Sequence, residues 1–403
     1  MRLVITGGGT GGHLYPGLAV AEALLARMPE AEVRFMGGTR IESRIVPESG
    51  WPYTRVAAHP LPRRLGVGQL KAAAVNLLGL VQAALQLGGL RPDAVLATGG
   101  YVAGPVGLAA VLLGMPLVVQ EQNAIPGLTN RWLGRWATRI SLPPAAAGVF
   151  PRDRAVITGV PVRPSVLRGE RRAARAALGL APDRFTILTL GGSQGAHTIN
   201  RAITEAATLL MYEPVQILHQ TGGQTGGQTG GQTGGQTGGQ TGSEDLEWVR
   251  REIGHREHVG PPVLRQVAVP FIERMGDAYA AADLIICRAG ASTLAEVTAW
   301  GLPAILVPYP HAAGDHQEAN ARPLVEAGAA ELIADADLTG IRLAQSLGAL
   351  LRAPVRRREM GEAARAVAHP HAADRVVDLL LEAAGLPRPR TSEEMGAKVI
   401  ASR

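Results

Sequence analysis

The chain has 403 residues, 46% of them hydrophobic and 18% charged, which is long and apolar enough for two or three domains with sizeable cores. A single cysteine, Cys287, excludes an internal disulfide framework, and no paired Cys/His spacing typical of structural zinc occurs. The net charge of +6 is unevenly divided, since residues 1–163 carry +8 and the remainder −2. A basic front half suits anionic lipid or a phosphorylated substrate, whereas 4% aromatics and no basic run interleaved with them argue against nucleic acid.

The front part of the chain alternates β-rich and helical runs, which is typical of a parallel sheet covered by helices on both faces. A strand is predicted over Arg2–Thr6, with no signal-peptide apolar region before it, so we expect no secretion and a reducing compartment. A glycine loop follows, and then a helix on which Leu18, Ala21, Leu24 and Leu25 form one apolar face. Further strands are predicted in VRFMG, AVLAT and LVVQ.

Two uncharged stretches raise the question of a membrane. Ala94–Gln120 is long enough to span a bilayer, but its Gly and Pro residues break it, so we predict a buried strand–helix–strand unit. Ala72–Leu90 is interrupted only by Asn76, Gln82 and Gln86. It is flanked by the cations Arg63, Arg64, Lys71 and Arg91. Two interpretations of it stay open: a core helix, or an apolar face that lies on an anionic bilayer.

The alternating pattern restarts after a proline-rich link, GVPVRPSV. FTILTL runs into GGSQGA and a helix from about His197, and later strands are predicted in VQILH, QVAVP, LIIC and AILVP. A helix is also predicted over Ser292–Trp300. We therefore predict two doubly wound, Rossmann-like α/β domains, residues 1–163 and 164–369, which face each other across a cleft.

Three segments fall outside this alternation. Residues 220–242 repeat QTGG and contain no apolar residue, so we interpret them as a flexible surface loop without catalytic importance. A helix at about 370–386 is expected to pack back on the first domain, and residues 387–403 are expected to form a loose tail.

Each predicted domain opens with a strand followed by a glycine loop. The first loop, Thr6–His13, directs backbone N–H groups and a helix N-terminus at a ligand, which suits a phosphate or diphosphate. A dinucleotide site would also need an acidic residue after the second strand, and VRFMGGTR has none. His13 is a candidate general base at the loop mouth, with a capping or merely hydrogen-bonded role as the alternative. The second loop, Gly191–Ala196, repeats the geometry and adds the hydroxyl of Ser193.

Polar residues follow two later strands of the second domain. Gly290–Thr293 lies at a predicted helix start, and Glu296, one turn further, can accept hydrogen bonds from two hydroxyls of a ribose or sugar. A second group suits sugar hydroxyls and comprises His311, Asp315, Gln317 and Asn320. Asp315 and His316 lack a third ligand at helical spacing, and we identify no metal-binding Asp-x-Asp motif, so we expect no metal and no other cofactor.

Six motifs in register make the chain resemble the MurG family of bacterial UDP-N-acetylglucosamine (UDP-GlcNAc) transferases. They are GGTGGHLYPGLA (Gly8–Ala19), GGYVAGP (Gly99–Pro105), EQNAIPGLTN (Glu121–Asn130), GGSQGA, CRAGASTLAE (Cys287–Glu296) and HAAGDHQEANA (His311–Ala321). The resemblance runs from Met1 to about Ala384 and implies the GT-B fold. It implies an inverting hexosyltransferase that moves N-acetylglucosamine to the C4 hydroxyl of undecaprenyl-pyrophosphoryl-MurNAc-pentapeptide in peptidoglycan synthesis, and hence in cell shape and division.

The resemblance also implies site residues. In the second domain, the backbone of Ile272 would contact uracil, Glu296 the ribose, and Ser193 and Arg163 the diphosphate. The residues that would surround the nucleotide-sugar are Ala291, Ser292, Thr293, Leu294, Ala295 and Gln317. The front-domain residues that would close over the reacting end are Thr10, Gly11, Gly12 and Asn123. His13 would be the base, with Glu121 as second candidate.

The resemblance implies peripheral attachment to the cytoplasmic face of an anionic membrane, where cell-wall synthesis proteins are possible partners. The chain departs from the family at two places, because Val160 replaces a usual Asn and the HQTG segment has expanded into the repeat. Three alternatives stay open: another GT-B glycosyltransferase for lipids or natural products, a UDP-sugar epimerase, and a non-catalytic UDP-sugar-binding protein.

Overall fold

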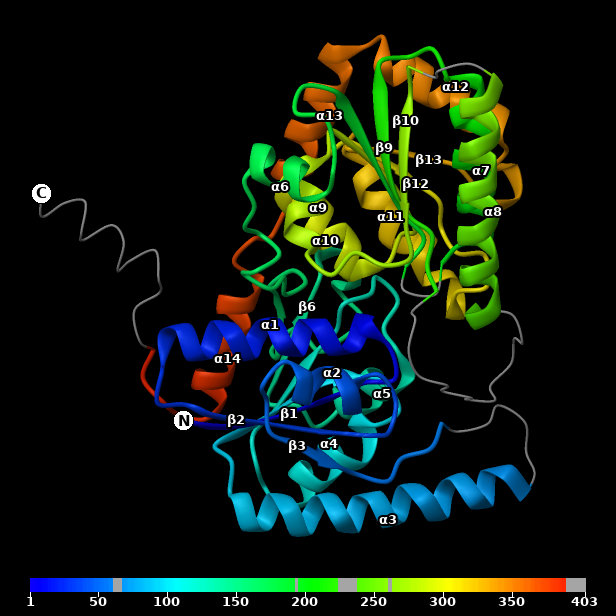
Figure 1. Ribbon diagram of the computed structural model, residues 1–403. Coiled ribbons are helices and arrows are strands. Elements are labelled where there is room, and N and C mark those ends of the chain that lie inside the picture. Colours follow the sequence, from blue (N-terminus) through cyan, green and yellow to red (C-terminus); the bar gives the residue numbers. More distant parts are fainter. Residues whose placement is uncertain (61–66, 193–194, 224–237, 260–262, 389–403) are drawn as a thin grey trace, which may run out of the picture. The chain divides into compact units, whose positions relative to one another are not determined.

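The computed structural model describes residues 1–60, 67–192, 195–223, 238–259 and 263–388 of the chain. It divides into two compact units. Unit 1 comprises Met1–Pro164 and His369–Arg403, and unit 2 comprises Ser165–Ala368. Both are parallel-sheet α/β units, which confirms the predicted fold class (Figure 1).

Unit 1 contains a seven-stranded parallel sheet in the order β3-β2-β1-β4-β5-β6-β7. Its strands are β1 (Arg2–Gly7), β2 (Glu32–Gly37), β3 (Tyr53–Arg55), β4 (Ala94–Gly99), β5 (Leu117–Gln120), β6 (Arg139–Leu142) and β7 (Ala155–Ile157). Its helices are α1 (Gly11–Arg27), α2 (Glu42–Glu48), α3 (Val67–Leu90), α4 (Ala103–Leu112), α5 (Leu128–Leu133), the short η1 (Pro144–Ala146) and α14 (Ala372–Ala383). β4, α4 and β5 confirm the predicted strand–helix–strand unit.

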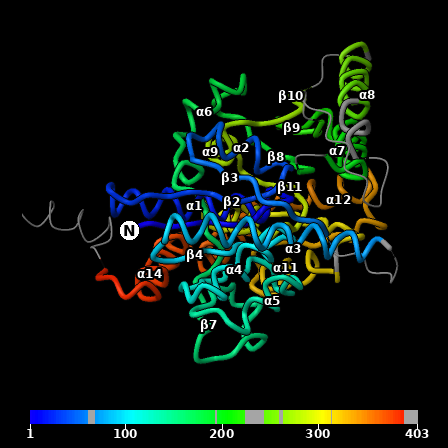
Figure 2. Tube along the Cα trace, turned by 90° about the horizontal axis from the view of Figure 1, so that it is seen from below, coloured from blue at the N-terminus to red at the C-terminus, as the bar shows by residue number. Residues whose placement is uncertain are grey.

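Two apolar layers cover the sheet of unit 1. On one face, Leu18 and Leu24 of α1 pack with Val376 and Leu380 of α14, so α1 and α14 lie side by side although more than 300 residues separate them (Figures 1 and 2). The buried Arg27 side chain of α1 adds an ion pair to Asp378, at 2.7 Å. On the other face, α4 and the inner side of α3 cover the strands. The apolar runs read from the sequence are therefore buried on both faces of the sheet.

α3 presents two different faces. Its inner stripe, with Ala72, Ala83 and Leu87 at 0% exposure, packs against the unit. A Cβ at Gly79 would lie 1.8 Å from the carbonyl oxygen of Ala57, so only glycine allows this approach. Its outer face carries apolar side chains that are at least half exposed, namely Leu70, Leu77, Leu78, Val81 and Leu85. Of the most apolar 18-residue stretch of α3, only 17% is buried.

Unit 2 contains a six-stranded parallel sheet in the order β10-β9-β8-β11-β12-β13. Its strands are β8 (Phe185–Leu190), β9 (Val215–Gln220), β10 (Arg265–Val269), β11 (Leu284–Cys287), β12 (Ala304–Leu306) and β13 (Ala330–Leu332). Its helices are α6 (Arg171–Ala177), α7 (His197–Leu209), α8 (Gly238–Val259), α9 (Met275–Ala281), α10 (Ala291–Trp300), α11 (His316–Glu326), α12 (Gly340–Leu351) and α13 (Pro354–Ala366), with the short η2 (Ala313–Asp315) and η3 (Asp335–Asp337).

The glycine-rich repeat differs from its prediction at both ends. Thr221 and Gly222 are buried, and their N–H groups donate to the carbonyls of Val269 and Pro270 at 3.0 and 3.1 Å. At the other end, the last residues of the repeat begin α8 at Gly238. The interpretation of all of 220–242 as a loop is therefore wrong at its ends, because strand pairing and helix formation satisfy the backbone there. The middle of the repeat lies outside the described residues, as does most of the expected tail.

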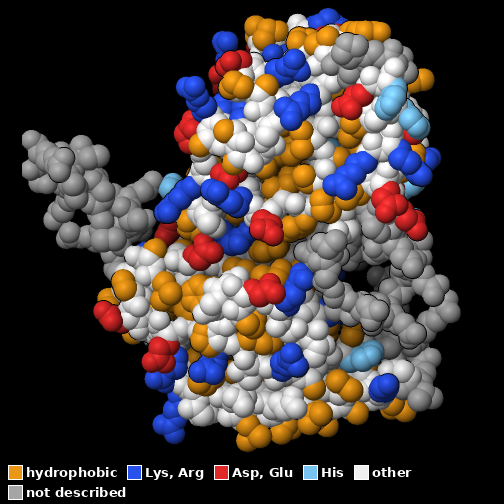
Figure 3. All heavy atoms as spheres, viewed as in Figure 1, with side chains coloured by type: hydrophobic (Ala, Val, Ile, Leu, Met, Phe, Trp, Pro, Cys, Tyr) orange, Lys and Arg blue, Asp and Glu red, His pale blue; other side chains and the backbone are white. Residues whose placement is uncertain are grey.

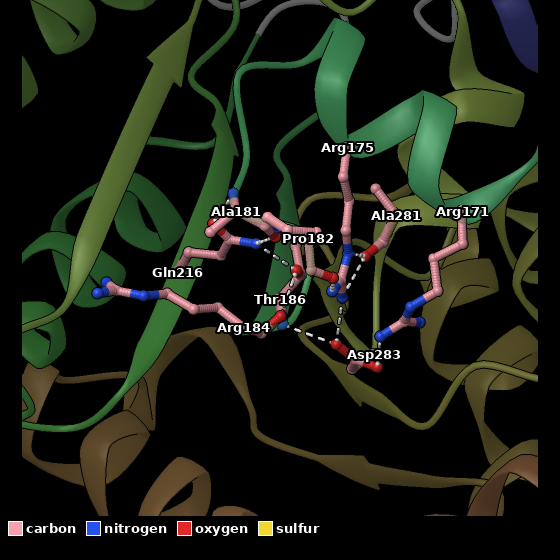
Figure 4. A network of polar contacts seen from close by, with 9 residues as sticks. All are labelled: Arg171, Arg175, Ala181, Pro182, Arg184, Thr186, Gln216, Ala281 and Asp283. Atoms are coloured by element: carbon pink, nitrogen blue, oxygen red, sulfur yellow. Dashed lines mark hydrogen bonds and ion pairs between the residues drawn. The ribbon is translucent and has the colours of Figure 1, made fainter.

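A polar network ties α6 and α9 to the sheet of unit 2 (Figure 4). The guanidinium of Arg175, with its side chain 1% exposed, donates to the carbonyl of Ala281 and to Asp283. Asp283 also accepts from the backbone N–H of Thr186 at 2.8 Å and from Arg171 at the molecular surface. Several donors thus balance one carboxylate, which is the condition for burying an ion pair without a large desolvation penalty.

Candidate functional site

Both sheets reverse their strand order next to a glycine loop. In unit 1 the reversal lies between β1 and β4, which lead into Gly7–Gly12 and Gly99–Gly104. In unit 2 it lies between β8 and β11, which lead into Gly191–Ala196 and the start of α10. Ligands of open α/β sheets bind at such switch points, beyond the carboxyl ends of the strands. The two glycine loops and the start of α10 lie at the switch points of their own units. Other expected residues follow different strands, because Asn123 follows β5, Ile272 follows β10 and Gln317 lies on α11.

The first glycine loop is fixed by a buried carboxylate. Glu42, at 0% exposure, accepts from the N–H of Gly9 at 2.8 Å and from that of Gly38 at 3.1 Å. The N–H of Gly8 donates to the carbonyl of Gly99. The first amides of the loop thus have acceptors within the protein. At the start of α1, the N–H groups of Gly11 and Gly12 have no i−4 acceptor in the helix, which is the arrangement that suits an anionic ligand. Nothing in the local sequence ESRIVPE marks Glu42 as a loop anchor.

His13 is oriented by its own helix turn. Its Nδ1 lies 3.0 Å from Oγ1 of Thr10, a hydrogen bond that sets which ring nitrogen faces away from the helix start. The ring lies against Gly99, where a Cβ would come within 2.7 Å of His13 Cδ2 and 3.1 Å of Asn130 Nδ2. Gly99 adopts a φ of 104°, which favours glycine. His13 is only partly buried.

Glu121, the second candidate base, is 1% exposed and surrounded by donors. Oε1 accepts from the backbone N–H groups of Gln122 and Asn123, each at 2.9 Å. Oε2 accepts from the N–H of Gly127 at 3.1 Å and from Asn130 Nδ2 at 2.9 Å. Burial raises the pKa of Glu121 above its usual value, while these donors act in the opposite direction. The geometry is that of a carboxylate that folds the loop carrying Asn123.

Arg163 belongs to unit 1 by its position in the chain. Its guanidinium lies over the ring of Tyr15, 4.8 Å from the centroid, in a cation–π contact. Its Nε is buried and lacks a hydrogen-bond partner among the described residues. A buried donor of this kind is costly unless a ligand or water satisfies it.

In unit 2, Gln220 links the second glycine loop to the loop of Ile272. Its Nε2 donates to the carbonyl of Gly192 at 3.2 Å, and its Oε1 accepts from the N–H of Ile272 at 2.9 Å. Gln220 is 4% exposed, so the bridge is internal. Because Gln220 is also the first residue of the QTGG repeat, its sequence gives no sign of this role. Ser193 lies outside the described residues.

α10 carries six of the expected residues in succession. Gly290 precedes it without a side-chain cap, which leaves the first amides of the helix for other acceptors. Ser292 Oγ is buried without a hydrogen-bond partner in the described part of the chain, whereas Leu294 is buried in the core. Ala291, Thr293, Ala295 and Glu296 are partly buried. From α11, Gln317 accepts a hydrogen bond from the N–H of Tyr309 at 2.9 Å.

An Asp-x-Asp sequence does occur, at Asp335–Asp337, which corrects the expectation that none is present. Asp335 accepts from Arg288 and from Thr198 Oγ1, so this carboxylate is already engaged by protein donors. Among the residues that the structure describes, no cluster of three or more His, Cys, Asp or Glu side chains could hold a metal ion.

Two doubly wound parallel-sheet units, each with an amide-rich helix start at its switch point, define a protein of the two-domain, Rossmann-like α/β class. Residues 3–142 match the glycosyltransferase family 28 N-terminal domain, and residues 186–376 match its C-terminal domain. The chain therefore belongs to glycosyltransferase family 28.

The relatives are full-length matches. The chain is 41% identical, over 96% of its own length and 99% of the relative's, to a UDP-N-acetylglucosamine–N-acetylmuramyl-(pentapeptide) pyrophosphoryl-undecaprenol N-acetylglucosamine transferase of Desulforudis audaxviator. The enzyme of the same name from Moorella thermoacetica is 40% identical over 95% of this chain and 99% of the relative.

Two solved structures match this chain over nearly its whole length. The crystal structure of Acinetobacter baumannii MurG is 32% identical, with a TM-score of 0.69 over 94% of this chain and 99% of that one. A UDP-GlcNAc 2-epimerase from Neisseria meningitidis reaches a TM-score of 0.64 over 95% of this chain and 100% of its own, but at 12% identity it shows the fold alone.

Proposed function

We propose that this chain is an inverting hexosyltransferase that moves N-acetylglucosamine from UDP-GlcNAc to the C4 hydroxyl of undecaprenyl-pyrophosphoryl-MurNAc-pentapeptide, in peptidoglycan synthesis. The observation that carries the proposal is 41% identity over 96% of the chain to a transferase of that name. The epimerase alternative rests on 12–14% identity, which speaks only for the fold.

We assign the donor to unit 2 and the acceptor to unit 1. In this assignment the α10 start, Ala291–Glu296, and Gln317 surround the nucleotide-sugar, and Ser193 and Arg163 contact the diphosphate. Because the Ile272 N–H is held by Gln220, the contact of Ile272 with uracil uses its carbonyl. Thr10, Gly11, Gly12 and Asn123 lie at the reacting end.

The chemistry follows from this assignment. His13 takes the proton of the C4 hydroxyl as that oxygen attacks the anomeric carbon, the bond to UDP breaks, and the configuration inverts in a single displacement. We assign the base to His13 because Glu121 is buried and its two oxygens are occupied by four amide N–H donors. Departing UDP gains negative charge, which helix N-termini, backbone N–H groups and Arg163 stabilise, each such donor contributing about 3 kcal/mol.

The test is UDP release from UDP-GlcNAc, measured with and without a lipid-linked muramyl-pentapeptide acceptor. We expect release only with acceptor, together with an N-acetylglucosaminylated lipid product. Epimerised sugar formed without acceptor would identify an epimerase, and binding without release would identify a non-catalytic protein.

We further propose that unit 1 lies on the cytoplasmic face of an anionic membrane, through the outer face of α3. The polyprenyl acceptor requires such a location. Leu77, Leu78 and Leu85 are 62%, 53% and 73% exposed, and hydrophobic side chains line this edge of the molecule (Figure 3). Asn76 and Gln82 do not interrupt this face, because their side chains bond the backbone of His59 and Ala57. Exposed Lys71 lies near the start of α3 and exposed Arg91 directly follows the helix, while Arg63 and Arg64 lie outside the described residues.

Co-sedimentation with vesicles of phosphatidylglycerol and phosphatidylcholine tests this contact. We expect Leu77→Gln/Leu85→Gln to weaken binding at least about tenfold, since burying each leucine contributes about 1.5–3 kcal/mol. Leu209→Gln, on an exposed leucine of unit 2, is the matched control. Leu80 is unsuitable for the test because it packs against the core of unit 1. Unchanged binding of the double variant would remove α3 from the interface. From the family resemblance, we also propose that the chain binds other cell-wall synthesis proteins.

A further inference from the structure

A buried phenol lies behind the carboxylate that we assign to the ribose. Tyr279, on α9, is 1% exposed, and its hydroxyl donates to Oε2 of Glu296 at 2.6 Å. Glu296 itself is only partly buried. The hydrogen bond therefore runs from the interior of unit 2 to a group that reaches its surface.

The surroundings keep the phenol a donor. Burial raises the pKa of Tyr279 well above 10, and the adjacent carboxylate adds to the shift. Cys287, also fully buried beside this pair, has its pKa raised to about 12 by burial and by Glu296, so it carries no competing charge. The position of Tyr279 is itself fixed, since Arg175 binds the carbonyl of Ala281 at the end of the same helix.

We propose that Tyr279 is a positioning residue for nucleotide recognition: it orients the Glu296 carboxylate so that the enzyme distinguishes a ribose from a 2′-deoxyribose. This inference rests on the proposed function, which assigns Glu296 to the ribose. A glutamate side chain has a broad terminal torsion and loses rotamer freedom when it binds. The phenol fixes that torsion before the ligand arrives, so the entropy lost on ordering the Glu296 side chain does not reduce the binding free energy.

The mechanism predicts a specific change in selectivity. Without the phenol, the carboxylate loses the hydrogen bond at Oε2, and its hydrogen bonds to the two ribose hydroxyls lose their alignment. Tyr279→Phe is therefore expected to raise the KM for UDP-GlcNAc about tenfold with kcat nearly unchanged. The preference for UDP over dUDP, measured as the ratio of their inhibition constants against UDP-GlcNAc, is expected to fall by a similar factor.

The experiment compares wild type, Tyr279→Phe, Glu296→Gln and the double variant. Tyr53→Phe is the matched control, because it removes a phenol hydroxyl that donates to the carbonyl of Gly38 in unit 1. We expect the control to keep the wild-type UDP/dUDP ratio. In the Glu296→Gln background, Tyr279→Phe is expected to change the ratio no further, as the double-mutant cycle of a coupled pair requires.

Each outcome bears on the inference. A ratio that falls in Tyr279→Phe, without further change in the double variant, supports it. An unchanged ratio, or equal weakening of UDP and dUDP, overturns it and leaves Tyr279 a purely structural residue. If Tyr279→Phe is too unstable to assay, Glu296→Asp, which withdraws the carboxylate from the phenol, must lower the ratio, and an unaltered ratio contradicts the inference. Wild-type enzyme that fails to transfer N-acetylglucosamine would instead refute the proposed function.

Discussion

Glu121 of unit 1 and Glu296 of unit 2 both lie beyond the carboxyl end of a parallel strand, but they differ in burial and in hydrogen-bond partners. Glu121 directly follows β5, is 1% exposed, and accepts hydrogen bonds from amides of its own loop. Glu296 lies on the helix after β11, is partly exposed, and is held from behind by Tyr279. The oxygens of Glu121 are thus bonded to its own loop, which gives this carboxylate a structural role, whereas Glu296 is held by a buried phenol and is partly exposed.

Replacing His13 gives the sharpest contrast between the units. We expect His13→Ala to lower kcat at least about 100-fold while the KM for UDP-GlcNAc stays within about twofold, because in the proposed mechanism His13 acts on the acceptor and unit 2 binds the donor. Steady-state kinetics of UDP release measure both constants. His255→Ala, on an exposed histidine, is the control. Near-normal turnover would remove His13 from the mechanism.

Conservative substitution of the two glutamates tests whether Glu121 and Glu296 have different roles. Glu121→Gln places an amide donor against N–H donors, so we expect it to lower the free energy of unfolding of unit 1 by about 3 kcal/mol. Glu296→Gln, on a partly exposed side chain, is expected to cost less than about 1 kcal/mol but to raise the KM for UDP-GlcNAc at least about tenfold. Hydrogen exchange of amides in each sheet measures the stability of each unit.

The pH dependence of kcat/KM separates a structural role for Glu121 from a catalytic one. If Glu121 only folds the loop of Asn123, Glu121→Gln lowers the rate but leaves the apparent pKa values of the profile unchanged. Loss of one limb of the profile would make Glu121 the base and end the contrast with Glu296.

Much of the fold could be predicted from the sequence. Arg2–Thr6, Phe185–Leu190 and Leu284–Cys287 are short apolar runs before glycine or polar turns, and the structure confirms each as a buried parallel strand. Burial on both faces makes such runs uniformly apolar, so local sequence suffices to find them. Family motifs then marked the glycine loops and α10.

What could not be predicted depends on contacts distant in the chain. Glu42 anchors Gly9 from 33 residues away, and Gln220 joins loops that follow different strands. No local pattern distinguishes such residues from a solvated side chain. The prediction of a loop over the whole repeat was wrong at its start for a related reason, since Thr221 and Gly222 are buried by pairing with the backbone of Val269 and Pro270.

The network around Asp283 predicts a graded loss of stability within unit 2. Asp283→Ala leaves the buried Arg175 without its counter-ion and the N–H of Thr186 without its acceptor, so we expect a loss of about 2–3 kcal/mol. Arg171→Ala removes the surface member of the same network and should cost less than about 1 kcal/mol. Hydrogen exchange in β8 and β11 checks both. Equal losses would show that burial does not set the energy of this network.

Unit 2 also buries a histidine of β9, for which unit 1 offers no described counterpart. His219 is 0% exposed, with Nε2 2.9 Å from Asn200 Oδ1 and Nδ1 3.0 Å from Gln266 Nε2. Because Oδ1 can only accept and the Gln266 amide can only donate, His219 is the neutral Nε2–H tautomer. Burial, with a smaller contribution from Arg256, lowers its pKa to about 3.

The lowered pKa of His219 makes the stability of unit 2 depend on pH. Between the usual pKa of 6.5 and about 3, the unfolded chain binds a proton that the folded chain does not, so stability is fully present above pH 6.5 and falls as pH falls toward 3. From pH 7 to pH 5 this loss amounts to about 2 kcal/mol in unit 2. Gln at this position offers an N–H to Asn200 and an oxygen to Gln266 but does not titrate. We therefore expect His219→Gln to remove about 2 kcal/mol of the difference between pH 7 and pH 5, measured by hydrogen exchange in β9, whereas His255→Gln keeps it. The same pH dependence in His219→Gln as in wild type would show that this histidine is protonated within the fold. The hydrogen-bond directions between His219, Asn200 and Gln266 would then have to be reassigned to a charged imidazolium.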